Sequence, residues 1–144
     1  MNNFFKSFIF SALWMIIIII LSLMPVSNMN MPNIIRIPHL DKLAHIFMYF
    51  VFTLLLVFGF RTYSQGEFKK IYYLISFILA IVLGGLTEIA QGIYFSSFSR
   101  QKDLIDFIAN TAGVFFALLI CYLQLDIIVW NRLFKLLRIK LKIN

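Results

Sequence analysis

Apolar residues in this chain gather into four long runs, at about residues 5–24, 43–60, 71–94 and 104–124. A helix needs about 20 consecutive, mostly apolar residues to cross the hydrocarbon core of a bilayer. Each run is close to that length, and polar connectors separate the runs. The pattern predicts an all-α integral membrane protein, in which a four-helix bundle forms a single domain over residues 1–144.

The first run is the one that resembles a signal peptide. It has a positive flank at Lys6, but it is longer than the usual apolar core of a signal peptide, and no pair of small residues follows it. Pro25, Pro32 and Pro38 then disfavour helix in the first connector. We therefore expect an uncleaved first helix that ends before a polar loop.

Composition agrees with a membrane location. Of the 144 residues, 62% are hydrophobic and 13% are charged, whereas an ordinary soluble domain is about 25% charged. The net charge of +7 is spread over short loops and a tail, without a basic groove that has interleaved aromatic residues, so we expect no nucleic-acid partner. The single cysteine, Cys121, excludes an internal disulfide and a cysteine-based metal cluster.

The C-terminal segment has a pattern of its own. Over residues 127–141, basic side chains recur every three or four positions, and Ile, Leu and Phe occupy much of the remainder. The segment is too short and too charged to span a bilayer, and Trp130 is a residue type that anchors at the membrane interface. We expect a C-terminal amphipathic interfacial helix, with a partner-binding helix as the alternative.

Lys and Arg residues are unevenly distributed over the two sides that four spans define. Nine fall on the side of the two termini and four on the other side. Because cytoplasmic loops carry the excess of Lys and Arg, this bias predicts a multi-pass protein of the cytoplasmic membrane with both termini in the cytoplasm.

Polar residues interrupt the apolar runs near the side of the membrane opposite to the two termini. Asp41, His45 and Tyr49 are four residues apart, so they share one face of the second helix. Similar stripes occur at the end of the third run and the start of the fourth: Glu88 and Gln91, then Asp103, Asp106, Asn110 and Gly113. Ionisable side chains are costly within a membrane and mark functional sites. We therefore expect the three stripes to face one another inside the bundle.

Three interpretations of these polar residues are open. In the first, they form a hydrogen-bonded network that fixes the register of the helices. In the second, they line a pocket for an anionic lipid or a lipid-linked cell-envelope intermediate. In such a pocket His45, Glu88 and Asp106 would exchange protons. Arg100, with Lys42 nearby, would bind a phosphate or carboxylate. The third interpretation is a divalent cation site, although no metal-binding motif occurs and we expect no cofactor.

These interpretations define the candidate residues. The candidate catalytic residues are His45, Glu88 and Asp106. The residues expected to contact a ligand are Asp41, Lys42, Tyr49, Gln91, Arg100, Asp103 and Asn110.

Three motifs, in this order, resemble the VanZ-like family of small bacterial membrane proteins. They read D-K-x-x-H-x-x-x-Y at 41–49, E-x-x-Q at 88–91 and R-x-x-D-x-x-D-x-x-x-N-x-x-G at 100–113. The resemblance covers about residues 38–120, and every polar position of the three motifs is present. It implies a role at the outer face of a bacterial cytoplasmic membrane and in susceptibility to the lipid-bearing glycopeptide teicoplanin. The resemblance assigns no reaction.

Overall fold

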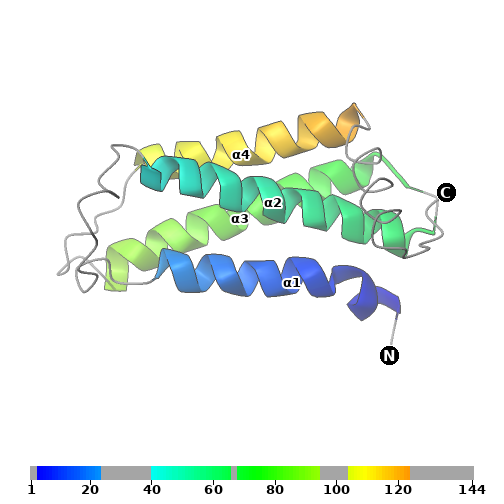
Figure 1. The fold of residues 1–144 in the computed structure, drawn as a ribbon, viewed down its shortest axis with the longest axis horizontal. Coiled ribbons are helices and arrows are strands. Elements are labelled where there is room, and N and C mark those ends of the chain that lie inside the picture. The colour runs from blue at the N-terminus through cyan, green and yellow to red at the C-terminus, as the bar shows by residue number, and fades with distance from the viewer. Residues whose placement is uncertain (1–2, 24–39, 66–67, 95–103, 124–144) are drawn as a thin grey trace.

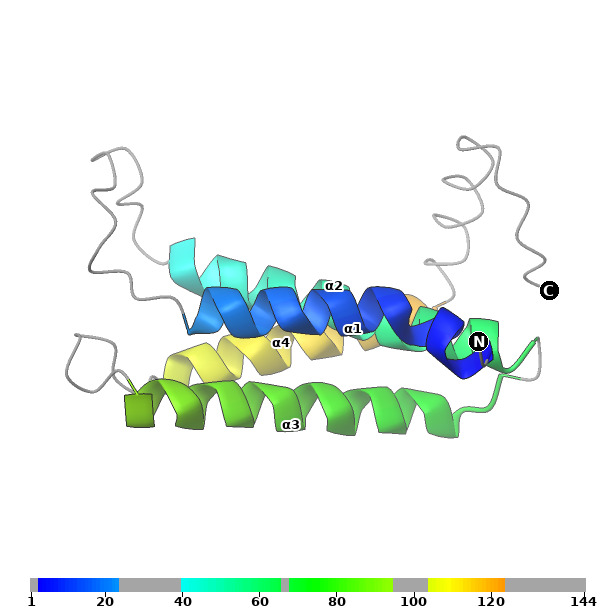
Figure 2. The same ribbon diagram turned by 90° about the horizontal axis from the view of Figure 1, so that it is seen from below.

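The computed structural model describes residues 3–23, 40–65, 68–94 and 104–123. They form the four α-helices α1 (Asn3–Ser22), α2 (Leu40–Tyr63), α3 (Ile71–Tyr94) and α4 (Leu104–Tyr122). Successive helices run in opposite directions, so the starts of α2 and α4 lie at the same end of the bundle as the ends of α1 and α3 (Figures 1 and 2). All four are long and apolar enough to cross a membrane, which confirms the predicted all-α membrane fold.

The helices differ from the predicted spans mainly at their ends. α2 covers Leu40–Tyr63, where hydropathy predicts 43–60. Asp41 lies in its first turn and Arg61 in its last turn, and these charges have the signs that stabilise the two ends of a helix dipole. The helix therefore continues beyond its apolar run. The interfacial helix predicted at 127–141 lies outside the described residues.

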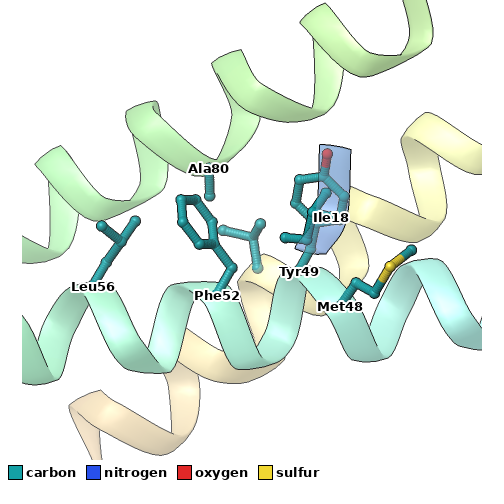
Figure 3. Close-up of a cluster of buried hydrophobic side chains, with 7 residues drawn as sticks. Ile18, Met48, Tyr49, Phe52, Leu56 and Ala80 are labelled. Atoms are coloured by element: carbon teal, nitrogen blue, oxygen red, sulfur yellow. The ribbon is translucent and has the colours of Figure 1, made fainter. Parts of the chain in front are cut away.

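α2 is the central helix of the bundle. It contacts α1, α3 and α4, and its contact with α4 is the most extensive of the three. In Figure 3, Tyr49, Phe52 and Leu56 project from α2 toward α3, where the small side chain of Ala80 leaves room for them. The same cluster also contains Met48 of α2, Ile18 of α1 and Val114 of α4. One apolar core thus joins all four helices.

Small side chains bring α4 close to α2. Four of them recur at intervals of four along α4 and are buried: Ala109, Gly113, Ala117 and Cys121. A Cβ atom added to Gly113 would collide with the carbonyl oxygen of Ile46 and lie 3.0 Å from the backbone nitrogen of Phe50. Small residues at this spacing allow the backbones of membrane helices to touch. This contact places the starts of α2 and α4 side by side.

α1 is held mainly by α2. A Cβ atom added to Gly59 would lie 2.7 Å from the ring of Phe8, so only glycine allows this approach without a shift of that ring. Farther along α1, the indole N–H of Trp14 donates a hydrogen bond to the carbonyl oxygen of Met48 at 2.9 Å. The outward faces of all four helices carry large exposed apolar side chains, as expected of surfaces that contact lipid.

Candidate functional site

The polar residues predicted to form a site gather toward one end of the bundle, where α2 and α4 begin and α3 ends (Figures 1 and 2). Six of them are buried: His45, Tyr49, Glu88, Gln91, Asp106 and Asn110. Asp41 is exposed and Lys42 is half-buried. Arg100 and Asp103 lie outside the described residues.

His45 and Asn110 form a buried link between α2 and α4. Nδ1 of His45 lies 2.9 Å from Oδ1 of Asn110, and each residue is 2% exposed. An amide oxygen accepts hydrogen bonds and does not donate them, so we infer from this amide orientation that Nδ1 carries a proton. Nε2 is therefore the ring nitrogen at which His45 accepts a further proton.

Asp106 lies beside that nitrogen. Its Oδ2 is 3.9 Å from Nε2 of His45, which is too far for a direct hydrogen bond, and its Oδ1 is 3.0 Å from Nζ of Lys42. Both atoms accept hydrogen bonds, so a hydroxyl group beside them can donate its one hydrogen to either of them. The two side chains thus place two acceptors next to each other between α2 and α4.

Exposure falls from the outside to the inside along this group. The side chain of Asp41 is 54% exposed, that of Lys42 20%, that of Asp106 12% and that of His45 2%. Nζ of Lys42 contacts both carboxylates, at 3.4 Å from Asp41 and 3.0 Å from Asp106. A polar path therefore leads from the end of the bundle to its interior between α2 and α4.

α3 contributes a second set of polar contacts. The hydroxyl groups of Tyr49 and Thr87 are 2.9 Å apart, and Thr87 also donates to the carbonyl oxygen of Gly84. Glu88, the residue after Thr87, is buried and 8% exposed. A Cβ atom on Gly84 would lie 3.4 Å from the ring of Tyr49 and 3.5 Å from the amide nitrogen of Asn110. The α3 residues therefore adjoin the group that α2 and α4 form.

Gln91 has a different role from its predicted neighbours. Its Nε2 donates to the carbonyl oxygen of Ser22 at 2.7 Å. Ser22 is the last residue of α1, and the final carbonyls of a helix have no partner within that helix. Gln91 thus completes the end of α1 and fastens it to α3.

Two polar contacts escaped the sequence analysis. Thr87 lacks a charge and so drew no attention, although Gly84, Thr87 and Gln91 follow the same spacing of three and four as the other stripes. At the opposite end of the bundle, Arg61 donates to the carbonyl oxygen of Cys121 at 3.1 Å and to the hydroxyl of Tyr73 at 3.2 Å. The sequence analysis placed Arg61 in a loop, so its contacts with Tyr73 and Cys121 were not predicted.

The candidate metal site finds no set of ligands within the described ranges. No group of three or more His, Cys, Asp or Glu side chains with suitable geometry occurs there. The carboxylate of Asp106 is instead paired with Lys42. Within the described ranges the polar group consists of hydrogen bonds and the ion pair of Lys42 with Asp106.

Comparisons with protein-family models, with curated proteins and with solved structures find no match for this chain. The resemblance to the VanZ-like family therefore stays a prediction from the three motifs. The functional argument depends on the geometry of the site itself.

Proposed function

We propose that this protein binds a lipid or lipid-linked component of the bacterial cell envelope through the polar end of its bundle. One observation carries the proposal: Nε2 of the buried His45 and Oδ2 of Asp106 face each other across 3.9 Å, with Lys42 leading outward from them. A headgroup hydroxyl that approaches these two atoms from the side would donate its hydrogen bond to Nε2 or to the carboxylate. The same contact would start a modification of the headgroup if His45 removes that proton.

The remaining residues would support such a ligand. Lys42 fixes the carboxylate of Asp106, and it would supply, together with Arg100, the positive charge for a phosphate next to the hydroxyl. Asn110 orients the ring of His45 through Nδ1. Glu88 adds a second buried carboxylate on α3, where it would accept a hydrogen bond from a further hydroxyl group of the ligand.

Orientation forms part of the proposal. The excess of Lys and Arg on the side of the termini supports a polar end that faces the outside of the cytoplasmic membrane. A ligand would then arrive from the outer leaflet. The resemblance to the VanZ-like family supports the same face, and it adds the expectation that expression in a sensitive host raises the teicoplanin concentration needed to stop growth.

Native mass spectrometry of protein extracted from bacterial membranes tests the proposal. We expect wild-type protein to retain a lipid that Asp106→Asn loses, because the substitution keeps the size of the side chain and removes its charge. Arg61→Gln is the control, since it removes a charged side chain that links α2 to α4 at the other end of the bundle. Retention of the same lipids in the same number by Asp106→Asn and the wild type would contradict the proposal.

A scaffold without a ligand is the second candidate. It is favoured by the fact that the polar contacts join different helices, as His45–Asn110, Tyr49–Thr87 and Gln91–Ser22 do. On this view the polar residues fix the register of the helices. Asp106→Asn and Arg61→Gln would then lower the stability of the protein alike, and neither would change the mass of bound lipid.

A further inference from the structure

An apolar groove lies between α1 and α3 with α2 as its floor, in the half of the bundle that is remote from the polar site. Its volume is about 280 Å³. The residues that line it include Phe8, Ala12, Met15, Phe52, Leu56 and Leu79. α1 and α3 touch each other little. The bond from Gln91 to Ser22 joins them at the polar end, and Figure 1 shows the two helices diverging from there.

The lining offers an occupant no free polar group. Ser11 is the single polar residue among those that line the groove, and its hydroxyl already donates to the carbonyl oxygen of Phe8 at 2.8 Å. The rings of Phe4, Phe8 and Phe60 pack against one another at the remote end, with centroids 4.8 and 4.9 Å apart. A molecule in this groove therefore contacts hydrocarbon alone.

The size of the groove selects among apolar occupants. A cavity of about 150 Å³ with a similar lining holds one benzene molecule, so 280 Å³ holds roughly a dozen carbon atoms. A helix about 10 Å wide that rises 5.4 Å per turn needs on the order of 500 Å³ for a single turn. The groove thus fits most of one acyl chain and excludes an inserted helix.

Charge at the same end of the bundle selects a headgroup. Lys6 lies near the start of α1, on the face opposite to the residues that line the groove, and Lys69 and Lys70 directly precede α3; all three are exposed. Arg61, in the last turn of α2, already donates to Tyr73 and Cys121 and is not part of this headgroup site. Within the described ranges this end carries Lys and Arg and no acidic residue. Basic side chains at a membrane surface attract anionic lipids by about 1 kcal/mol each.

We propose that this groove holds one acyl chain of an anionic phospholipid from the leaflet at the N-terminal end of α1, with its phosphate near Lys69 and Lys70. The site does not depend on the polar site, because it lies in the other half of the bundle and none of the polar-site residues lines it. It gives the protein a lipid ligand in each leaflet.

Photo-crosslinking tests this site directly. The full chain is placed in nanodiscs of phosphatidylglycerol that carries a diazirine in one acyl chain, and adducts are mapped by mass spectrometry. We expect adducts at the groove residues Ala12, Met15 and Leu79 to exceed those at the exposed α4 residues Phe115 and Phe116 about fivefold, the ratio that ~1 kcal/mol of preference produces. Equal labelling of the two sets would overturn the site.

Two kinds of variant test the binding of the acyl chain and the binding of the headgroup separately. Ala12→Trp fills the groove from α1 and should abolish the excess, whereas Leu13→Trp on the neighbouring exposed face should keep it. Changing Lys69 and Lys70 together to Gln leaves the core untouched and should remove the preference for phosphatidylglycerol over phosphatidylcholine. An excess that survives Ala12→Trp would overturn the acyl-chain site. Labelling that does not depend on the headgroup would overturn the preference for an anionic lipid.

Discussion

Asp106 is the residue on which the polar site depends, because it contacts the partly exposed Lys42 and lies next to the buried His45. It occupies the first turn of α4, where a negative charge is favourable beside the helix N-terminus. The surrounding network therefore holds the Asp106 carboxylate with compensation from a cation and a helix dipole. In the proposed site, this carboxylate is the group that a ligand would meet next to Lys42.

The hydroxyl of Tyr49 gives a residue-scale prediction. Tyr49→Phe keeps the buried ring and removes the bond to Thr87, so the free energy of unfolding should fall by about 1 kcal/mol. Reversible unfolding in mixed detergent micelles measures this change. Tyr122→Phe, at an exposed position, is the control and should leave stability unchanged. Equal stability of the two variants would show that the Tyr49–Thr87 bond contributes nothing.

Spacing along the sequence predicted which polar residues share a helical face but not their partners. The intervals between Asp41, His45 and Tyr49 place them on one helical face, and two of the three are buried. How α2 is rotated against α4 depends on the contact at Gly113, which a pattern within one helix cannot show. The pairing of His45 with Asn110 and the role of Gln91 at the end of α1 follow from that packing and emerged only with the structure.

At the scale of helices, the bundle depends on close backbone contact between α2 and α4. The small residues of α4 permit this contact, and Gly113 is the position at which no side chain fits. The four spans were predictable, because length and hydropathy alone identify them. The helix ends were less so, because α2 extends over charged residues that stabilise its two termini.

Gly113→Ala tests the contact between these helices. The added methyl group meets the carbonyl oxygen of Ile46 and the nitrogen of Phe50, and backbone atoms cannot rotate away. We expect a loss of about 1–3 kcal/mol in unfolding free energy. Gly85→Ala is the matched control, since its methyl group would lie 3.9 Å from the ring of Phe107, an ordinary contact. Similar losses in both variants would mean that Gly113 is not a point of close approach.

At the scale of the whole molecule, the two ends of the bundle have opposite characters. One end holds buried carboxylates, histidine and amides, and the other carries exposed lysines beside an apolar groove. The proposed orientation places the first end outside and the second in the cytoplasm. Each end would then meet a different leaflet with the chemistry suited to its lipids.

Cysteine labelling tests this orientation. In a Cys121→Ala background, Asp41→Cys should react with a membrane-impermeant maleimide added to intact spheroplasts, because Asp41 is exposed at the proposed outer end. Lys69→Cys should react only after the membrane is permeabilised. The reverse pattern would place the polar site on the cytoplasmic side and exclude a ligand from the outer leaflet.

Ligand-induced stabilisation tests most directly whether the polar end is a binding site. A ligand that binds only the folded protein raises its unfolding temperature. Delipidated wild-type protein and Asp106→Asn are each titrated with a bacterial lipid extract while thermal unfolding is followed. Our account predicts that the extract raises the unfolding temperature of the wild type by clearly more than that of Asp106→Asn. Arg61→Gln should show the same rise as the wild type. An equal rise in the wild type and Asp106→Asn would contradict it.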